Sequence, residues 1–171
     1  MLQIQKTTNE DKATLRNLMQ HYLHEMSNLS PDIQINKKGE YPQKYFDSYF
    51  SDDPTRSAYL ATQDNKLAGF CLVNEYTIIS EHKPTKSISE FYILPNQRKQ
   101  WLGKEFAHHI FALHPWRRET RQIKNNTQGQ SFRQSTIQSY PAQKYTQKEI
   151  NSDSLSAEQV DWHGPIQVFH I

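Results

Sequence analysis

The stretch from residue 88 to residue 113 constrains the fold more than any other part of the sequence. Residues 88–94 are mostly β-branched and aromatic and predict a strand, which Pro95 ends because proline has no backbone N–H for a sheet ladder. After a short basic loop, apolar residues recur at helical spacing over residues 101–113. The order of strand, loop and helix predicts an α/β fold.

The same stretch predicts an anion-binding site, because unpaired backbone N–H groups and the positive end of the dipole meet at a helix start. Arg98, Lys99 and Lys104 add positive charge there, and Gly103 permits close backbone approach. A solvated helix start with no ligand is the alternative.

The N-terminal part predicts a strand and an amphipathic helix. Residues 3–6 have strand character, and Thr8 with Asp11 forms a capping-box signature. The following apolar residues form one helical stripe: Leu15, Leu18, Met19, Tyr22, Leu23 and Met26. A second short helix is predicted around residues 42–50, with an aromatic face (Tyr45, Phe46 and Tyr49) that either packs in the core or lines a substrate entrance.

The remaining pattern predicts a β-hairpin and alternating elements toward the C-terminus. Residues 57–62 and 66–79 have strand character and flank an Asp64-Asn65 turn. A brief strand is predicted at residues 120–123, a helix at 127–139 and a strand region at 160–171. The polar tract at residues 143–158 predicts a loop.

Length and composition indicate a single domain, residues 1–171, in a reducing compartment. The single cysteine, Cys71, excludes an internal disulfide framework, so we expect a cytoplasmic protein. The sequence contains no run of about 18 apolar residues, so neither a membrane span nor a leader is predicted. The formal charge of +2 implies no partner. No metal site is predicted, since His21 and His24 share a helix face without further ligands.

Arg98-Lys99-Gln100-Trp101-Leu102-Gly103 resembles the acetyl-coenzyme A signature of the GNAT superfamily of N-acetyltransferases, Arg/Gln-x-x-Gly-x-Gly/Ala after a strand. Glu90-Phe91-Tyr92-Ile93, Arg121-Gln122-Ile123 and the helix of residues 126–132 resemble elements of bacterial GNAT proteins. The resemblance therefore covers most of the chain. It implies a mixed, mostly antiparallel sheet, splayed between the strands ending at Leu94 and Ile123 and flanked by helices.

The resemblance also implies acetyl-coenzyme A as co-substrate. In such proteins the strand end pairs with the pantetheine arm, the loop wraps the pyrophosphate, and Asn126 would bind the pantetheine arm unless it is a plain N-cap. The predicted cofactor-binding residues are Phe91, Tyr92, Ile93, Arg98, Lys99, Gln100, Trp101, Leu102, Gly103, Lys104 and Asn126.

Three positions depart from the family pattern. Trp101 replaces the first glycine of the loop, Gly129 replaces an alanine, and Arg133 stands where the tyrosine that protonates the leaving thiolate is usual. Arginine does not give up its proton, although it can stabilise a thiolate. Acid catalysis would then fall to Tyr140, Tyr92 or solvent.

Glu90 is the predicted general base, because it lies on the strand beside the expected thioester. A structural role, pairing with an arginine or capping a neighbouring element, has equal weight, and Glu119 is a second candidate base.

The leading hypothesis is therefore acetyl transfer to a primary amine, small-molecule or peptide, in a ternary complex. The alternative is a catalytically impaired GNAT domain that binds coenzyme A or a protein partner without turnover. A basic cluster could contact nucleic acid, but a solvated rim around the cofactor's phosphates explains it better. Its members are Arg117, Arg118, Arg121 and Lys124. A homodimer is left open.

Overall fold

The computed structural model describes residues 1–78, 85–98, 101–115, 117–141, 146–151 and 164–170, which form two compact units. The first unit comprises Met1–Val73 and Glu90–Arg98, and the second comprises Asn74–Ser89 and Lys99–Ile171. One strand, β4 (Thr85–Ile93), contributes its beginning to the second unit and its end to the first. Each unit is described by itself below.

The strands of the first unit are β1 (Leu2–Lys6), β2 (Ser57–Gln63), β3 (Lys66–Asn74) and the end of β4, neighbours in this order. β1–β2 and β2–β3 are antiparallel. Asp64 and Asn65 connect β2 to β3 with φ angles of 50° and 62°, the left-handed geometry of a tight hairpin turn. The predicted hairpin is confirmed, although β3 ends at Asn74 and not at residue 79.

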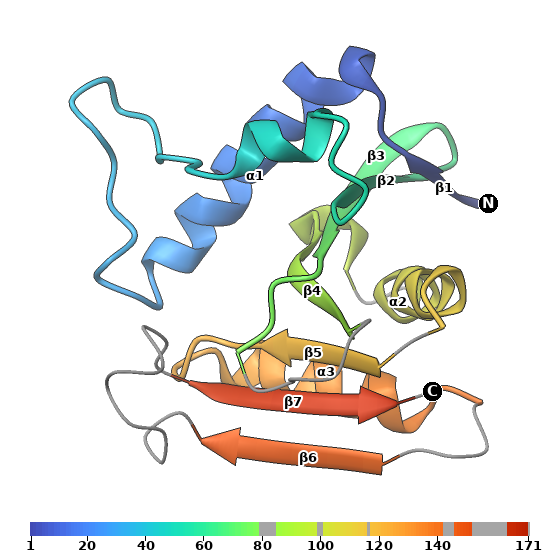
Figure 1. Cartoon of the computed structure of the whole chain (residues 1–171). Coiled ribbons are helices and arrows are strands. Elements are labelled where there is room, and N and C mark those ends of the chain that lie inside the picture. The colour runs from blue at the N-terminus through green and yellow to red at the C-terminus, as the bar shows by residue number, and fades with distance from the viewer. Residues whose placement is uncertain (79–84, 99–100, 116, 142–145, 152–163, 171) are drawn as a thin grey trace. The chain divides into compact units, whose positions relative to one another are not determined.

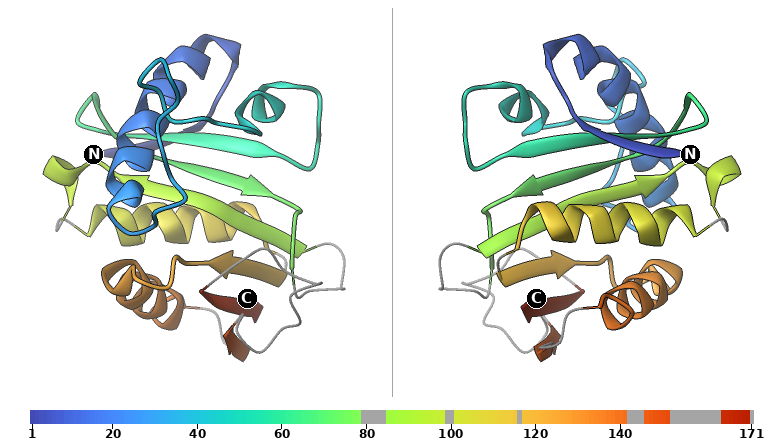
Figure 2. Two further views of the ribbon diagram at one scale, coloured as in Figure 1. Left: turned by 90° about the vertical axis from the view of Figure 1, so that its left-hand side faces the viewer. Right: turned by 90° about the vertical axis from the view of Figure 1, so that its right-hand side faces the viewer.

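One long helix, α1 (Lys12–Ser27), lies on one face of these strands (Figure 2). The predicted start is confirmed in its capping box, since the Thr8 N–H donates to the Asp11 carboxylate over 2.9 Å, and a 3₁₀ turn at Asn9–Asp11 precedes the helix. The core of the first unit combines buried residues of the α1 stripe, one residue of the segment between α1 and β2, and inward-facing residues of the strands. Its members are Leu15, Leu18, Met19, Phe46, Ala58, Leu60, Phe70, Leu72 and Tyr92.

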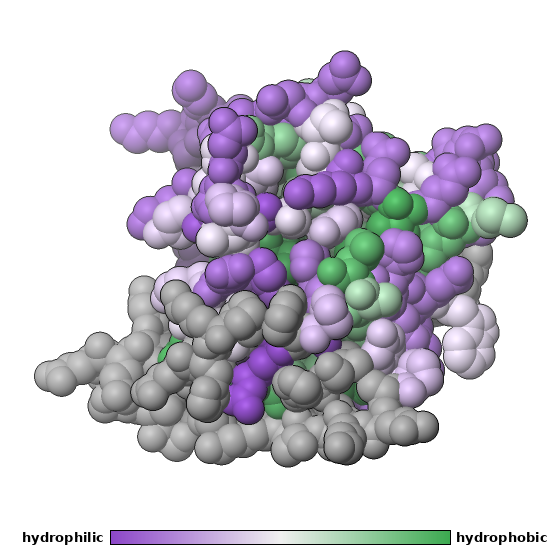
Figure 3. Space-filling view, turned by 45° about the vertical axis from the view of Figure 1, so that its right-hand side comes forward, coloured by the Kyte–Doolittle hydropathy of each residue, from purple (hydrophilic) through white to green (hydrophobic). Residues whose placement is uncertain are grey.

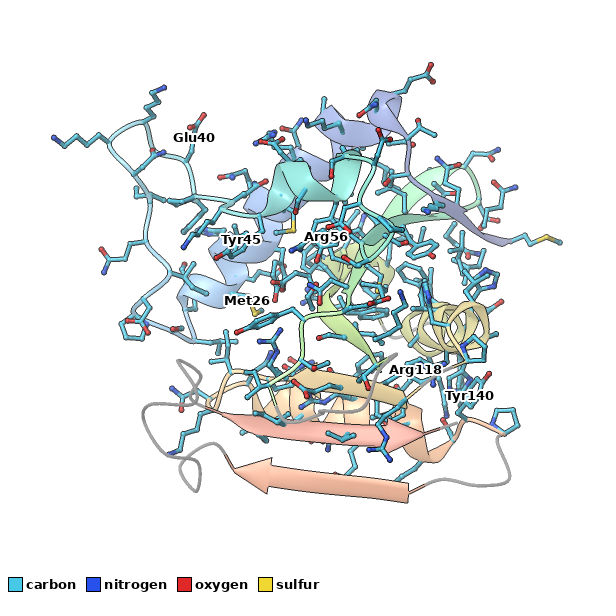
Figure 4. The ribbon with its side chains drawn as sticks, in the orientation of Figure 1. Met26, Glu40, Tyr45, Arg56, Arg118 and Tyr140 are labelled. Atoms are coloured by element: carbon cyan, nitrogen blue, oxygen red, sulfur yellow. The ribbon has the colours of Figure 1, made fainter. Side chains whose placement is uncertain are left out.

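The second predicted helix is shorter than expected, a 3₁₀ helix at Phe46–Phe50. Phe46 is buried in the core and Tyr49 packs against it, whereas Tyr45 is 61% exposed (Figure 4). Asp47 fixes this helix to α1, because its carboxylate pairs with Lys12 over 2.9 Å and with Arg16 over 2.6 Å. The aromatic face therefore serves mainly in core packing.

In the second unit the beginning of β4 is followed by β5 (Arg117–Arg121), β7 (Pro165–His170) and β6 (Thr146–Asn151). β4 and β5 are parallel from Thr85–Arg117 to Ile88–Thr120, and the other ladders are antiparallel. The helices are α2 (Leu102–Leu113) and α3 (Thr127–Gln138), with α3 lying against β5 and β7 (Figure 1). The predicted class, a mixed, mostly antiparallel sheet flanked by helices, is confirmed.

Two predictions in this unit are wrong in position. The strand expected at residues 120–123 is β5, which begins earlier, at Arg117, and ends at Arg121. The tract at residues 143–158 contains β6, because its backbone pairs with β7 without needing an apolar side-chain pattern. The rest of that tract and residues 160–163 of the predicted C-terminal strand region lie outside the described residues.

Figure 3 shows hydrophilic residues over most of the described surface on one face, with apolar residues between them. Among the described residues, no helix combines the length and apolar character needed to cross a membrane.

Replacing Gly69 by Ala is expected to destabilise the protein by about 3 kcal/mol or more, because a new backbone clash exceeds ordinary overpacking. A Cβ atom at Gly69 would lie 2.1 Å from the Tyr92 carbonyl oxygen on β4. Chemical denaturation measures the effect, with Gly39→Ala as control. Gly39 has φ +77° but open space around it, so its replacement should cost only about 1 kcal/mol. Equal losses would contradict the close approach.

Candidate functional site

The predicted site residues fall into both units. Glu90, Phe91, Tyr92 and Ile93 form the end of β4 in the first unit, which also contains Arg98. Trp101, Leu102, Gly103, Lys104 and Asn126 belong to the second unit. Lys99 and Gln100 lie outside the described residues.

The carboxylate of Glu90 influences a tyrosine of α1 electrostatically. Because side chains alternate along a strand, Glu90 and Tyr92 share the face of β4 that carries α1. Burial raises the pKa of the Tyr22 hydroxyl well above its usual value, and the negative charge of Glu90 raises it further. The role of Glu90 as a base and its alternative structural role both stay predictions.

Tyr92, a candidate general acid, already uses its hydroxyl within the first unit. It donates to Glu25 on α1, and burial, followed by this hydrogen bond, raises the pKa of Tyr92 well above its usual value. A tyrosine that holds its proton this firmly is a weak acid. The structure therefore favours the other two candidates for protonating the thiolate.

Arg98 is bound to the end of β4 and to α1. Its Nη2 donates to Glu25 over 2.7 Å and its Nε donates to the Ile93 carbonyl oxygen over 2.9 Å. Its guanidinium also lies 5.5 Å from the centre of the Tyr92 ring. These contacts fix the residue from which the basic loop departs.

The start of α2 has the geometry of an anion site. Trp101 is the N-cap and adopts φ 58°, ψ −15°, the left-handed conformation that glycine adopts most easily. The first intrahelical bond in α2 runs from the Glu105 N–H to the Trp101 carbonyl over 3.0 Å. The N–H groups of Leu102, Gly103 and Lys104 therefore precede the helical ladder, where an anion can accept from them.

The ring of Trp101 is not buried against those N–H groups. Its side chain is 79% exposed, and the Lys104 ammonium lies 5.5 Å from its ring centre. Trp101 therefore stands at a position where the family pattern has glycine. The backbone there is left-handed, which suits glycine, but the residue is bulky.

Asn126 is the N-cap of α3, as one of the two interpretations predicted. Its Oδ1 accepts from the Gly129 N–H over 2.9 Å, and its Nδ2 donates to Gln122 over 3.2 Å. A Cβ atom at Gly129 would lie 2.6 Å from Asn126 Nδ2, which explains why glycine replaces the family's alanine. Binding of a pantetheine arm by Asn126 stays a prediction.

Arg133 and Tyr140, the other residues discussed for acid catalysis, have distinct surroundings in the second unit. Arg133 is only 7% exposed, and its Nη1 donates to Thr120 Oγ1 on β5 over 3.2 Å. The Tyr140 ring packs edge-on against His108 and Phe111, beside the C-terminal half of α2 (Figure 4). Tyr140 therefore lies away from the first turn of that helix.

Two charged residues of β5 are structural. Glu119, the second candidate base, is completely buried and accepts from the Ile78 N–H over 2.7 Å, so it holds the segment that follows β3. Arg118 is 1% exposed, so this one member of the basic cluster does not belong to the solvated rim that was expected. It donates to the carbonyls of Phe111 and His114 at the end of α2, and burial lowers its pKa to about 10. The sequence gives no signal for this helix-capping arginine.

Two surface hollows of the first unit lie apart from the predicted residues. One, of about 290 Å³, lies between the end of β1 and residues 49–56. The other, of about 220 Å³, lies between α1 and residues 36–43, where Gln20 exchanges two hydrogen bonds with the Tyr41 backbone. Residues 36–43 are thus docked on α1.

Comparison with known proteins identifies the family. The profile of the acetyltransferase (GNAT) family matches residues 17–128, more than half of the chain. The search of curated proteins gave no match.

Solved structures with the same fold include three acetyltransferases. A GNAT-family enzyme from Staphylococcus aureus shares 10% identity, with a TM-score of 0.65 and 98% of each chain covered. The diaminobutyrate acetyltransferase of Paenibacillus lautus, bound to L-2,4-diaminobutyric acid and coenzyme A, shares 12% identity at a TM-score of 0.63, covering 99% of this chain and 95% of that one. An N-acetyltransferase from Thermoplasma acidophilum, in complex with coenzyme A, shares 13% identity at a TM-score of 0.59, covering 99% and 98%. The chain therefore belongs to the GNAT family of acetyltransferases.

Proposed function

We propose that this protein transfers an acetyl group from acetyl-coenzyme A to a primary amine, by direct attack in a ternary complex and without a covalent enzyme intermediate. Family membership supports acetyl transfer, and two structural neighbours are complexes with coenzyme A. The observation that carries the proposal is the start of α2, where N–H groups of the first turn follow a left-handed N-cap.

The described residues fit such a co-substrate. The N–H groups of Leu102, Gly103 and Lys104 can receive the pyrophosphate, and the Lys104 ammonium adds charge beside them. The backbone of Phe91, Tyr92 and Ile93 lies beyond the last β4–β5 pair at Ile88–Thr120 and is the proposed partner of the pantetheine arm. Arg98 would act by fixing the start of the loop, since its side chain already binds Glu25.

Glu90 is the proposed general base. An ammonium group cannot attack a carbonyl, so the acceptor must lose a proton as its nitrogen bonds to the thioester carbon. In this step the new C–N bond forms, the C–S bond breaks, the proton passes to Glu90 directly or through water, and the thiolate leaves. Tyr140 or solvent would protonate the thiolate.

A catalytically impaired domain is the second candidate function, favoured by two observations. Trp101 occupies a left-handed position suited to glycine, and Arg133, at the usual general-acid position, is buried against Thr120. Such a domain would bind coenzyme A without turnover.

Calorimetric titration with acetyl-coenzyme A, followed by assays of thiol release, tests both candidates. The amines would be L-2,4-diaminobutyrate, a simple diamine, an aminoglycoside and a peptide with a free N-terminus. Binding with amine-dependent thiol release supports the enzyme, and binding without release supports the impaired domain. Absence of binding would overturn both.

Replacing Trp101 by Gly is expected to tighten acetyl-coenzyme A binding about fivefold, the equivalent of one net hydrogen bond of roughly 1 kcal/mol. Glycine adopts the φ of 58° without strain and opens the shortest backbone route to a phosphate. Titration of the two proteins measures the change, and Trp101→Asn, which tolerates the left-handed region but keeps a side chain, separates strain from bulk. Unchanged or weaker affinity would show that the indole is accommodated, and the impaired-domain candidate would lose its main support.

A further inference from the structure

One carboxylate on α1 binds the end of β4 and the start of the basic loop together. Glu25, in the last turns of α1, accepts from the Tyr92 hydroxyl on one oxygen and from Arg98 Nη2 on the other, the latter over 2.7 Å. Tyr92 is the second-last residue of β4, and Arg98 is the residue from which the basic loop departs. All three residues belong to the first unit, so these contacts are internal to it.

The Arg98 side chain is turned back onto its own strand. Its Nε donates to the Ile93 carbonyl oxygen over 2.9 Å, and its guanidinium carbon lies 5.5 Å from the centre of the Tyr92 ring. The backbone closes the turn between strand and arginine, since the Gln97 N–H donates to the Leu94 carbonyl over 2.8 Å. The guanidinium therefore contacts a carboxylate, a carbonyl and a ring of the first unit.

The Ile93 carbonyl lies on the edge of β4 that is proposed to meet the pantetheine arm. The Leu94 N–H donates to the Ala68 carbonyl on β3 over 2.8 Å, so the backbone of Leu94 faces β3. Because the backbone groups of successive strand residues point to opposite edges, those of Ile93 face away from β3. Arg98 therefore binds the carbonyl with which this edge of the strand ends.

The pairing with Glu25 neutralises the charge that Arg98 brings to the loop. The two side chains are 36% and 29% exposed, and their opposite charges largely cancel at distances well beyond their separation. The contacts of Arg98 therefore fit an anchoring role better than direct binding of a phosphate. In the proposed site, direct positive charge comes from Lys104 and from the N–H groups at the start of α2.

We propose that Glu25 is a positioning residue for acetyl-coenzyme A. By holding Tyr92 and Arg98 at once, it fixes the end of β4 and the first residue of the basic loop in the arrangement that receives the co-substrate. The proposal rests on the proposed function, since it takes the β4 end and the α2 start as the binding backbone. In this role Glu25 does not act on the reacting atoms, so its effect should fall on co-substrate affinity and not on the chemical step.

The test compares Glu25→Gln with Asp47→Asn. Each replacement removes the charge of a carboxylate that pairs with an arginine in the first unit, and the Asp47–Arg16 pair, at 2.6 Å, involves no residue of β4. Calorimetry at about 0.1 M and about 0.5 M salt would give the dissociation constant of acetyl-coenzyme A. Steady-state rates with the panel amine that gives the fastest thiol release would give KM and kcat, and thermal unfolding would give the Tm of each variant.

Glu25→Gln is expected to raise the dissociation constant and the KM of acetyl-coenzyme A roughly 10- to 100-fold, the value of a hydrogen bond to a charged group, with kcat little changed. Arg98→Met should show a similar loss at both salt concentrations, whereas the loss in Lys104→Met should shrink as salt is added. The Glu25→Gln/Arg98→Met double variant should bind no more weakly than the weaker single variant. Asp47→Asn should keep the affinity and the KM of the unaltered protein.

The outcomes separate this inference from the proposed function. Normal affinity in Glu25→Gln and Arg98→Met, beside a Gly103→Asp variant that loses binding, would overturn the positioning role alone. An Arg98→Met deficit that shrinks with salt would do the same, because it would show direct binding of a phosphate. Losses that multiply in the double variant, or an equal loss in Asp47→Asn, would also contradict the positioning role. Absence of acetyl-coenzyme A binding by the unaltered protein would overturn both.

Discussion

The Gly103→Asp variant is expected to lose acetyl-coenzyme A binding by roughly a thousandfold while α2 stays folded. Gly103 is the second residue of α2, next to the N–H groups proposed to receive the pyrophosphate. Like charges about 4 Å apart at an effective dielectric constant near 20 repel by about 4 kcal/mol, and this repulsion accounts for most of the loss. Bulk at the point of closest backbone approach adds to it.

The fold should survive because the same charge suits the isolated helix. A carboxylate in the first turn of a helix interacts favourably with the dipole, typically by about 0.3–1 kcal/mol. Aspartate at this position is therefore expected to repel the pyrophosphate without destabilising the helix. Circular dichroism should show unchanged helix content.

Gly103→Asn is the matched control, since asparagine has the shape of aspartate without its charge. It should lose only the part of the affinity that depends on bulk. The gap between the Asp and Asn variants should narrow as salt is added, because screening weakens repulsion at an exposed site. A folded Gly103→Asp protein with unaltered affinity would show that the pyrophosphate binds elsewhere.

Local sequence signals predicted the elements that depend on neighbouring residues. The Asp64-Asn65 turn, the Thr8–Asp11 capping box and the apolar stripe of α1 each act over a few residues, and all three are found in the structure. Asn126 as the N-cap of α3 belongs to the same class.

The features that sequence reasoning missed depend on pairings between distant segments. The sequence of β6 lacks an apolar–polar alternation, and the strand is identified by its backbone ladder with β7. β5 buries Arg118 and Glu119, whose partners are backbone groups at the end of α2 and at Ile78. Arg98 pairs with Glu25 far earlier in the chain. Such partners are chosen by the fold, and a local window of sequence does not contain them.

The Glu90→Gln variant is expected to lower turnover roughly 10²- to 10⁴-fold, the usual contribution of a general base, with little change in the affinity for acetyl-coenzyme A. Glutamine keeps the shape of glutamate and its capacity to accept a hydrogen bond, but it cannot take up a proton from the amine. The contacts that hold α1 against β4 should therefore persist, and the loss should fall on kcat.

The size of the loss should depend on pH. A free alkyl amine has a pKa near 10, so at pH 7 almost all of the acceptor is protonated and a base is needed. As pH rises toward about 9.5, more of the amine is already neutral, and the difference between Glu90→Gln and the unaltered protein should shrink. Glu10→Gln, which changes an exposed carboxylate of the same unit, should follow the unaltered protein at every pH.

A constant deficit from pH 7 to about 9.5, accompanied by weaker acetyl-coenzyme A binding, would mean that Glu90 serves the structure and does not take a proton from the acceptor. Thermal unfolding distinguishes these cases independently. A carboxylate that acts as the base can be replaced by glutamine with little loss of stability, whereas a purely structural carboxylate would show its loss mainly as a lower Tm.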